Sequence, residues 1–506
     1  MKRVVREKWD GKRKRRVRWT VGGDRITVPY DCGTNTAALP TVNTLFHACV
    51  SEHASFATID IVDFYLGATL PSPESMRVTL DHIPPSVLDE LGITPHLHTD
   101  SAGHPYCFFD IVKTVPGLPQ SGLLSQRRLI TLLNSHGYTE TTTPMLFRHS
   151  SRPITFTLVV DDFGVKYSSP SDLDHLITCL QTLYALKTHR TGNHYNYLGY
   201  TIDYAKPDRT MTLSMPAYIP SLLRQLRPSG IRHAPSPAIY TPPSYGSTAP
   251  QITPVDLSPL ASPAQHKEIQ VVCGSLLYYA RALDPTFLPA TTALASSQAR
   301  PTLKAVAASN RLLSYAAAHP NHSITIRPSN MILTAACDAS FLSRPKSGSV
   351  AGATFHLGPV PSTDPASPPT TPSVALHKFS TRIPVVCASI AEAEYAALFA
   401  AMQTACELRA TLTNFGYPQP PTPMYVDNKC AIGLATKTVR PKRSKSIDMR
   451  FDWIVDRVSQ KLFTVIFIPG TTNIADFYTK PLPAKEHKQL IPLLLGHQLL
   501  PLPLAP

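Results

Sequence analysis

Two adjacent carboxylates, Asp161 and Asp162, end a run of apolar residues, and this pattern constrains the fold more than any other in the chain. The run contains Leu158, Val159 and Val160 and is typical of a short buried strand. Two like charges at the end of a strand repel each other unless a cation lies between them. The pattern fits a metal-binding turn, but an Asp-Asp turn after a strand is common, so the neighbouring motifs are needed to distinguish the two.

A second apolar segment with a carboxylate lies upstream, at residues 58–67, and it carries Asp60. Mg²⁺ prefers hard oxygen ligands and leaves its remaining positions to substrate phosphates. Three carboxylates from two strands, Asp60, Asp161 and Asp162, therefore suit a pair of Mg²⁺ ions, and Mn²⁺ suits them as well. Such a pair would promote phosphoryl transfer to the 3′-hydroxyl of a primer.

Five segments of the first half follow one another in a specific order. They are a basic run at 12–18, the Asp60 segment, Leu118-Pro119-Gln120, Val160-Asp161-Asp162 and Tyr197-Leu198-Gly199-Tyr200. This order resembles the reverse transcriptase of copia-type LTR retrotransposons. The resemblance implies an RNA-directed DNA polymerase in which Asp60, Asp161 and Asp162 are catalytic and bind metal. Its partners would be an RNA template, a DNA primer and deoxynucleoside triphosphates.

Separate segments of the second half resemble the ribonuclease H domain of the same family. They are residues 332–340, 388–395, 424–428, 444–450 and 473–481. Four carboxylates match catalytic positions: Asp338, Glu394, Asp427 and Asp476. The resemblance implies that these four bind a second pair of Mg²⁺ or Mn²⁺ ions, which activate a water against the RNA of an RNA–DNA hybrid.

Each of these carboxylates also has an ordinary interpretation. Asp338 and Asp427 could be turn residues, Glu392 and Glu394 a solvated helix face, and Asp476 a helix cap. The family order of the whole set favours the catalytic interpretation. Within the helical motif, Glu394 matches the catalytic position better than Glu392.

Four further residues are candidates for contact with the incoming nucleotide, as the resemblance implies. Tyr65 would lie under the sugar and exclude a 2′-hydroxyl, or it could be a core aromatic. Gln120 would hydrogen-bond the nucleotide, or it could be a turn residue. Arg16 and Arg18 fall where a basic pair precedes the polymerase core.

The charge of the chain favours a polyanionic partner. The formal net charge is +14 and the pI is about 9.3, and Lys and Arg bind nucleic acid by releasing the counterions of its phosphates. The densest basic run is residues 12–18, followed by Trp19. A nuclear-import patch and a solvated basic arm are the alternatives to direct phosphate contact.

We expect an α+β fold, with a polymerase-like fingers and palm region followed by a connection and a ribonuclease H-like mixed-sheet domain. At 506 residues the chain has room for two or three domains. The expected segments are 1–230 for fingers and palm, 231–330 for a Pro-rich linker and connection, 331–490 for ribonuclease H, and 491–506 for a tail. Within them, helices are expected at 121–135, 171–186 and 391–412, and an enlarged hairpin loop at 359–372.

The cysteines and termini predict the compartment. Nine cysteines show no Cys-x-x-Cys and no zinc spacing, so reduced thiols in an intracellular protein are expected. The charged N-terminus is unlike a signal peptide, and the most apolar stretch, 490–505, is too short for a membrane span. A cytoplasmic, virus-like-particle location follows from the resemblance, with the nucleus as a second location and self-association of the chain as an open point.

One departure from the family pattern concerns Val159, where these enzymes usually have tyrosine near the primer terminus. The sequence nevertheless predicts both activities, polymerase and ribonuclease H. Two alternatives stay open. One is a non-catalytic nucleic-acid-binding remnant of a decayed element, and the other is a nuclease whose polymerase part only grips the hybrid.

Overall fold

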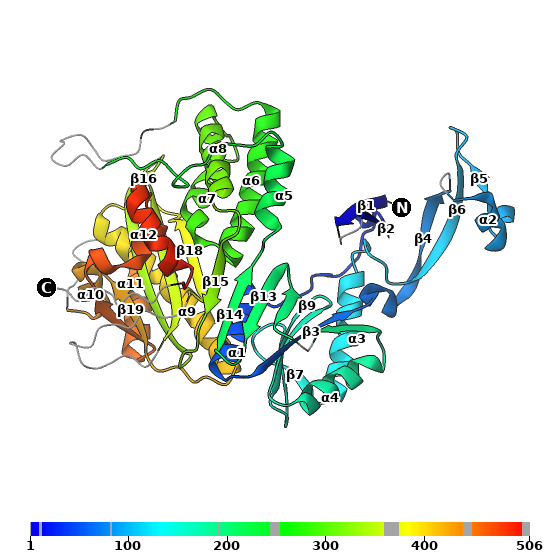
Figure 1. Cartoon of the computed structure of the whole chain (residues 1–506), viewed down its shortest axis with the longest axis horizontal. Helices are drawn as coiled ribbons and strands as arrows, with labels where there is room; N and C mark the ends of the chain where they lie inside the picture. Colours follow the sequence, from blue (N-terminus) through cyan, green and yellow to red (C-terminus); the bar gives the residue numbers. More distant parts are fainter. Residues whose placement is uncertain are drawn as a thin grey trace. The chain divides into compact units, whose positions relative to one another are not determined.

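The computed structural model of the chain describes residues 2–9, 13–80, 83–189, 192–242, 254, 256–358, 374–438 and 448–497. Contacts divide the chain into two compact units (Figure 1). The first comprises Met1–Ala37 and Thr58–His189, and the second comprises Ala38–Ala57 and Arg190–Pro506. Both mix helices with sheets, so the expected α+β class is confirmed. The domain boundaries expected from sequence at 230, 330 and 490 stay predictions.

A six-stranded sheet forms the centre of the first unit. Its order is β11 (Leu186–His189), β3 (Ser55–Ile61), β10 (Asp162–Tyr167), β9 (Ile154–Val159), β8 (Leu146–His149) and β7 (Tyr138–Glu140). Aromatic side chains fill its core, where the rings of Phe147 and Phe156 stack at 5.1 Å. The helices of this unit include α3 (Ser121–Ser135) and α4 (Pro170–Gln181).

The expected helix at 121–135 is confirmed, and the expected helix at 171–186 is too long. It ends at Gln181 because the residues from Leu186 onward form strand β11, which pairs with β3. Its start is set by Ser169, which forms a capping box with Asp172. Helix propensity continued past Gln181 in the sequence, and strand pairing overrides it.

Two smaller sheets complete the first unit. Strands β4 (Thr69–Thr79), β6 (Pro105–Lys113) and β5 (His98–Thr99) form one of them, and helix α2 (Pro85–Glu90) contributes Leu88 to its small core. Strands β1 (Lys2–Trp9) and β2 (Arg13–Thr20) pair as an antiparallel hairpin. Arg16 and Arg18 lie on β2, and their side chains lie outside the described part of the structure.

A four-stranded antiparallel sheet begins the second unit. Its order is β12 (His194–Tyr197), β13 (Tyr200–Ala205), β14 (Thr210–Ser214) and β15 (Ser323–Ile326). The Tyr197–Tyr200 motif is the tight turn between β12 and β13, where Gly199 has a φ of 84° that favours glycine. Helix α1 (Leu39–Ser51) packs on this sheet, and the Tyr204 hydroxyl donates to the Cys49 and Ala54 carbonyls.

Helices form a second layer in this unit. They are α5 (Tyr218–Leu226), α6 (Pro263–Ala282), α7 (Leu288–Ala295) and α8 (Leu303–Ala318). Ser262 and Gln265 form the capping box that starts α6. The Arg227 guanidinium joins three of these helices, because it donates to Glu268 at 2.6 Å and to Asn310 at 2.5 Å.

A five-stranded mixed sheet carries the functional residues of the second unit. Its order is β18 (His377–Arg382), β17 (Gly348–Gly358), β16 (Ile332–Arg344), β19 (Thr422–Val426) and β20 (Phe463–Phe467). The first three strands are antiparallel, whereas β16, β19 and β20 are parallel. Along the chain, three strands (β16, β17 and β18) precede the long helix of residues 390–414, and β19 follows it. The expected loop at 359–372 lies outside the described residues, but the strands that flank it pair as a hairpin.

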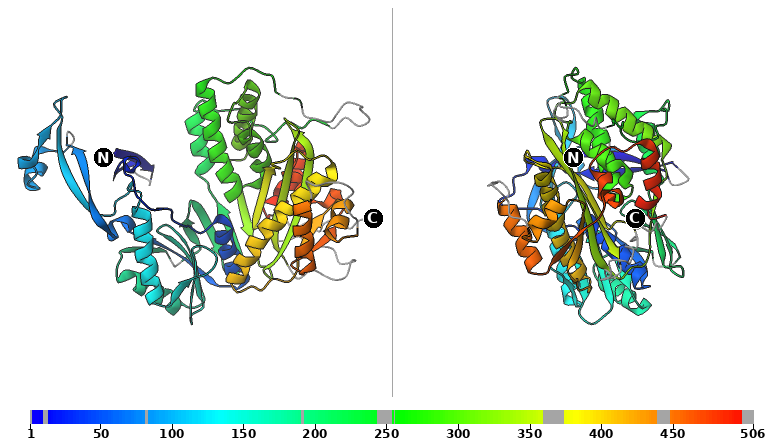
Figure 2. Two further views of the ribbon diagram at one scale, coloured as in Figure 1. Left: turned by 180° about the vertical axis from the view of Figure 1, so that it is seen from behind. Right: turned by 90° about the vertical axis from the view of Figure 1, so that its left-hand side faces the viewer.

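Helices cover both faces of this sheet (Figure 2). On one face lie α9 (Ile390–Asn414), α10 (Lys429–Ala435) and α11 (Asp448–Ser459). On the other lie the short helix η6 (Ile474–Tyr478), α12 (Ala484–Leu494) and α7. The α9 face is rich in alanine, and Ala393, Ala396 and Ala397 pack against β17, so the helix lies close to the strands.

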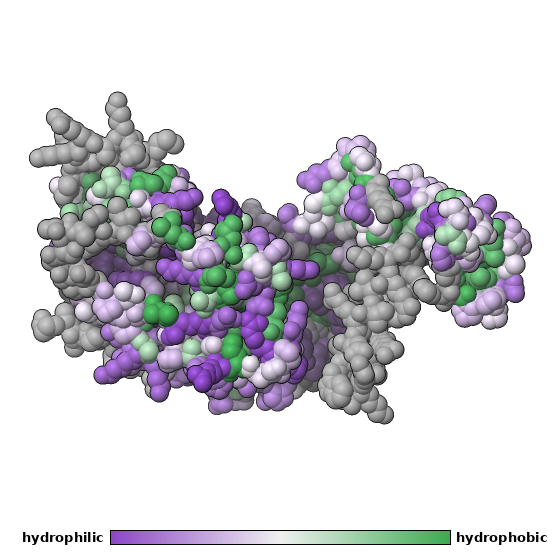
Figure 3. Space-filling model, turned by 90° about the horizontal axis from the view of Figure 1, so that it is seen from above, coloured by the Kyte–Doolittle hydropathy of each residue, from purple (hydrophilic) through white to green (hydrophobic). Residues whose placement is uncertain are grey.

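Scattered hydrophobic residues on the surface (Figure 3) and free thiols characterise the described part of the chain. Hydrophobic residues form small groups between hydrophilic ones on the face shown in Figure 3. Within the described ranges, no helix has the length and apolar character needed to cross a bilayer. All nine cysteines are free thiols.

The N-cap of α9 gives a stability prediction. The Ser389 hydroxyl accepts a hydrogen bond from the Glu392 backbone N–H at 3.2 Å. Ser389→Ala removes this bond and costs about 1 kcal/mol, so amide exchange in the first turns of α9 should accelerate about fivefold. Hydrogen exchange with mass spectrometry measures this, and Ser389→Thr, which keeps the hydroxyl, is the control. Equal exchange in Ser389→Ala and the unmodified chain would contradict the capping role.

Candidate functional site

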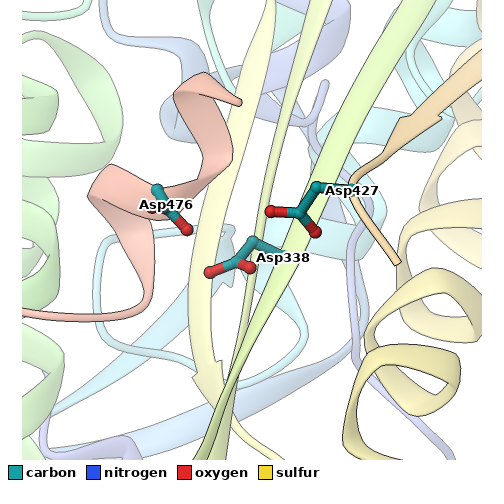
Figure 4. Close-up of side chains that lie close together, drawn as sticks. All are labelled: Asp338, Asp427 and Asp476. Carbon is teal, nitrogen blue, oxygen red and sulfur yellow. The ribbon is translucent and has the colours of Figure 1, made fainter. Parts of the chain in front are cut away.

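Three carboxylates converge at the carboxyl end of a parallel strand pair. Asp338 lies on β16, and Asp427 directly follows β19, which pairs with β16 at Ala335 and Ala336. Asp476 comes from η6 on the adjacent face. Each contributes one carboxylate oxygen to a set whose members all lie within 4.8 Å of one another (Figure 4). The structure therefore brings together three of the four residues expected in the second site.

The fourth residue, Glu394, lies in the first turns of α9 and is 9% exposed. Its carboxylate accepts a hydrogen bond from the Ala339 backbone N–H, and its charge interacts with those of Asp338, Asp427 and Asp476. Glu392 has a different role, since its side chain accepts from the Ala388 N–H at 2.7 Å and helps to start the helix. The geometry thus separates the two glutamates in the way that the sequence motif favours.

Burial and mutual repulsion dominate the electrostatics of this cluster. Burial, followed by the charge of Asp476, raises the pKa of Asp338 to about 8. Burial, followed by the charges of Asp338 and Asp427, raises the pKa of Glu394 to about 9. The pKa of Asp427 is also raised, by burial and by Asp476. The raised pKa values mean that, without a cation, protonation of some of these carboxylates is favoured because it lowers their mutual repulsion.

Three residues that sequence reasoning did not single out hold the carboxylates in place. The Thr479 hydroxyl donates to Asp338, and the Lys480 ammonium lies 2.9 Å from the Asp476 carboxylate. The Asn473 side chain caps η6 and donates to the Cys337 carbonyl at 3.0 Å. All three lie in the 473–481 motif, so the sequence motif contained enough information to identify them as candidates.

A glycine opposite Asp338 allows η6 to approach the sheet. Gly352 is the register partner of Asp338, and a Cβ at this position would lie 2.7 Å from the Thr479 side chain and 2.8 Å from that of Tyr478. Contacts this short do not occur with a real Cβ. The absence of a side chain therefore places Thr479 within reach of Asp338.

The other predicted carboxylates lie together in the first unit, in a more open arrangement. Asp60 is on β3, and Asp161 and Asp162 lie at the turn between β9 and β10. Burial, then Asp161, then Asp60 raise the pKa of Asp162 to about 6, so the three charges interact. The Lys187 ammonium lies 3.4 Å from the Asp60 carboxylate, and the exposed fractions of these two side chains are 68% and 41%. Among the described residues, these three do not form a set as compact as the one around Asp338.

The turn that carries Asp161 is strained. Val160 occupies its first position with a φ of 61°, a conformation that favours glycine and is costly for a β-branched residue. The Asp161 carbonyl accepts a hydrogen bond from the Ile61 N–H at 3.2 Å, which ties the turn to the strand of Asp60. The strain is thus maintained by the contact that brings the two segments together.

The candidates for nucleotide contact lie in different environments. Tyr65 is half-buried, and burial followed by the charge of Asp161 raises the pKa of its hydroxyl. Gln120 is 4% exposed; its Nε2 donates to Glu74 at 3.2 Å, while its Oε1 has no partner among the described residues. Contact of these two side chains with a nucleotide stays a prediction.

The sequence is similar to plant retrotransposon polyproteins. The chain is 27% identical over 353 residues to the retrovirus-related Pol polyprotein from transposon RE1 of Arabidopsis thaliana, covering 67% of this chain and 21% of that protein. For the polyprotein from transposon RE2 of the same plant, the identity is 26% over 380 residues, covering 73% and 24%. The homologues of this chain are retrovirus-related Pol polyproteins. The expected resemblance to copia-type elements is confirmed.

The extent of these similarities is limited. No protein-family model matches the chain, and the chain spans less than a quarter of the length of these two Pol relatives. A solved foamy viral protease-reverse transcriptase, in complex with double-stranded DNA, has a similar fold. Its TM-score is 0.50 at 12% identity, covering 92% of this chain and 64% of that one.

The donor set around Asp338 fits a divalent cation. Carboxylate oxygens are the ligands that Mg²⁺ and Mn²⁺ prefer, and three of them already lie at mutual distances that one ion can bridge. The raised pKa values of Asp338 and Glu394 record a repulsion that a cation would relieve. In this Pol homologue, Asp338, Asp427 and Asp476 would hold the ion, with Glu394 beside them.

This fit predicts a pH-dependent effect of Mg²⁺ on stability. Because the folded-state pKa values of Asp338 and Glu394 are about 8 and 9, the folded protein binds protons that the unfolded chain releases above about pH 4. Their contribution to stability is therefore present at low pH and lost as pH rises toward 9. Mg²⁺ should raise the thermal midpoint more at pH 9 than at pH 5, as measured by calorimetry.

Asp338→Asn is the matched control, since it removes the charge and keeps the shape. In EDTA it should raise the midpoint relative to the unmodified chain at pH 9 more than at pH 5. It should also lose most of the Mg²⁺ effect. A Mg²⁺ shift that is independent of pH and unaffected by this substitution would refute the assignment of the cluster.

The strained turn gives a second prediction. Val160→Gly relieves a conformation that costs about 1–3 kcal/mol but adds about 0.5–1 kcal/mol of chain entropy, so the first unit should become slightly more stable. Val160→Ala keeps the Cβ and should not stabilise. Amide exchange of the β9 and β10 segments measures the difference, and faster exchange in Val160→Gly than in Val160→Ala would show that the turn is not strained.

Proposed function

We propose that this chain is an RNA-directed DNA polymerase joined to a ribonuclease H, and that it copies retrotransposon RNA into DNA and degrades the RNA of the hybrid. The observation that carries the proposal is the compact carboxylate set of Asp338, Asp427 and Asp476, with Glu394 beside it. It occurs in a chain homologous to Pol polyproteins. The six-stranded sheet of the first unit would be the palm, and β4 to β6 would belong to the fingers.

The nuclease half depends on how its side chains are held. Two Mg²⁺ or Mn²⁺ ions bound there would neutralise the scissile phosphate and activate a water. Burial and the neighbouring carboxylates raise the pKa of Glu394 to about 9, so a bound cation would favour release of its proton. Thr479 and Lys480 fix the orientations of Asp338 and Asp476, so the site needs little rearrangement to receive the hybrid.

The polymerase half would use Asp60, Asp161 and Asp162. Lys187 shields Asp60 in the absence of substrate, and a triphosphate with its metal would compete with that ion pair. Tyr65 lies close enough to Asp161 to feel its charge, which supports a place for its ring under the incoming sugar. The Oε1 of Gln120, unpaired within the described ranges, supports a hydrogen bond to the nucleotide, in a pocket completed by substrate.

The partners follow from charge and from the comparisons. A net charge of +14 favours nucleic acid, and the foamy viral protein of similar fold was solved with double-stranded DNA. We propose an RNA template, a DNA primer, the RNA–DNA hybrid and deoxynucleoside triphosphates as partners. The intracellular location, Arg16 and Arg18 as phosphate contacts, and self-association belong to the same proposal.

A nuclease without polymerase activity is the second candidate. Two observations favour it: Val159 stands where the family usually has tyrosine, and the carboxylates around Asp60 are less compact than those around Asp338. In that case the first unit would only grip the hybrid. The non-catalytic remnant is disfavoured because the second site retains its carboxylates, their hydrogen bonds and their lysine.

Separate substitution of the two sites tests the proposal. Asp161→Asn should lower deoxynucleotide incorporation on an RNA template with a DNA primer by about a hundredfold or more, and should leave hybrid cleavage unchanged. Asp427→Asn should lower hybrid cleavage by a similar factor and should leave deoxynucleotide incorporation unchanged. Primer extension and cleavage of labelled RNA in a hybrid, each with Mg²⁺ and with Mn²⁺, measure the two activities.

Each outcome decides between the candidates. If the unmodified chain cleaves the hybrid but incorporates no deoxynucleotide, the nuclease without polymerase activity is the correct candidate. Tight hybrid binding with neither activity, in either metal, would identify a remnant. Asp208 is exposed and belongs to neither carboxylate site, so Asp208→Asn, a substitution of the same chemistry, is the matched control for both measurements.

A further inference from the structure

A small cavity lies in the second unit beside the carboxylate cluster. Its volume is about 50 Å³, which is room for a few waters or for one small anion. It is bounded by the end of β16, by α7, by residues 236–238 and by the segment that joins η6 to α12. The lining is mostly apolar, with Phe477 and Pro289 among its walls, and the described residues that form it include no aspartate or glutamate.

Arg344, the last residue of β16, lines this cavity with an unpaired charge. Its side chain is half-buried and makes no hydrogen bond or ion pair with any residue in the described ranges. Burial lowers the pKa of the guanidinium, without a neighbouring charge to offset it. A partly desolvated cation without a partner costs free energy, which a bound anion would recover.

The other polar groups of the lining add positive charge or are already engaged. The Lys480 ammonium bonds Asp476, so it connects the cavity wall to the carboxylate cluster. His487 is neutral, because burial lowers its pKa to about 4, and its Nε2 lies 3.0 Å from the Tyr315 hydroxyl. The Ser236 hydroxyl donates to the Ala238 carbonyl at 2.9 Å. An anion in the cavity would therefore meet two cations and no carboxylate of the lining.

The local backbone explains why Arg344 is available. The register between β16 and β17 shifts between Ser340 and Arg344, and such a bulge redirects the side chains that follow it. The turn after Arg344 places Lys346 and Ser347 at positive φ, 59° and 51°. Bulges of this kind are frequent beside active sites.

We propose that this cavity binds a phosphate group, with the Arg344 guanidinium as the main contact and Lys480 as the second. The planar fork of arginine matches two phosphate oxygens at once. The phosphate could come from the nucleic-acid backbone that lies across the carboxylate cluster, or from free phosphate or a nucleotide. The backbone source rests on the proposed function, whereas the phosphate site itself does not.

The first arm of the test uses inorganic phosphate and the full chain in EDTA, so that no catalysis contributes. Phosphate should raise the thermal midpoint of the unmodified chain above that in chloride of equal ionic strength. Arg344→Gln should lose this shift and should be at least as stable as the unmodified chain without phosphate, since an unpaired and partly desolvated charge is removed. Lys346→Gln, an exposed lysine outside the lining, is the matched control and should keep the shift.

The second arm measures binding of an RNA–DNA hybrid by fluorescence anisotropy over a range of salt, also in EDTA. For a backbone phosphate, Arg344→Gln should weaken binding about tenfold and reduce the salt slope by about one. The hybrid affinity of Arg344→Lys should lie between those of the unmodified chain and Arg344→Gln, because lysine keeps the charge and lacks the planar fork of the guanidinium. Lys346→Gln should change binding less than Arg344→Gln.

The outcomes separate the sources and the underlying function. A phosphate shift that depends on Arg344, with unchanged hybrid affinity, supports the site with a free phosphate as its ligand. An Arg344-specific loss of hybrid affinity supports the backbone source, whether or not either catalytic activity is present. The proposal is overturned if Arg344→Gln changes neither the phosphate-dependent midpoint shift nor the hybrid affinity, or if Lys346→Gln reduces them equally.

Discussion

The repulsion between buried carboxylates is the constraint on which the second unit is built. Parallel pairing of β16 and β19 brings Asp338 and Asp427 to one edge of the sheet, and η6 adds Asp476 from the neighbouring face. Asp338 is only 3% exposed, so water screens its charge poorly, whereas Asp427 and Asp476 are partly buried. The chain compensates locally, through the Thr479 hydroxyl, the Lys480 ammonium and the Ala339 N–H. Folding thus assembles an arrangement whose charge is balanced only when cations or protons are present.

The two acidic sites solve the same problem differently. Around Asp60 the carboxylates are more open to solvent, and Lys187 pairs with one of them across exposed surface. Exposed pairs contribute little to stability and exchange partners easily. Around Asp338 the side chains are held by hydrogen bonds from the buried Thr479 hydroxyl and the partly exposed Lys480 ammonium. Under the proposed function, the first site would receive a new nucleotide in every cycle and would benefit from exchangeable ion pairs, whereas the second would receive a formed duplex and would benefit from fixed side chains.

Sequence reasoning located the parts of the fold that local chemistry determines. Residues with strong helix propensity predict helix α3 and the centre of α9, and apolar runs predict strands of the five-stranded sheet such as β16. It also placed Glu394 in a helix, as the structure has it. It extended α4 too far, because the pairing of β11 with β3 joins residues distant in sequence. Arg344 could not be singled out, because its isolation depends on α7 and on the segment before α12, neither of which adjoins it in the chain.

The division of the chain into units has a consequence for how the protein is made. Helix α1 belongs to the second unit, yet 132 residues of the first unit, Thr58–His189, separate this segment from the rest of its unit. Its buried residues, including Val42, Leu45 and Phe46, are therefore synthesised well before the strands β12 to β14 that help to cover them. During translation the apolar residues of this helix therefore stay unpacked, or bound by a chaperone, until the residues after the first unit have been synthesised. A fragment of the second unit that begins at residue 190 would lack this helix altogether and would be prone to aggregation.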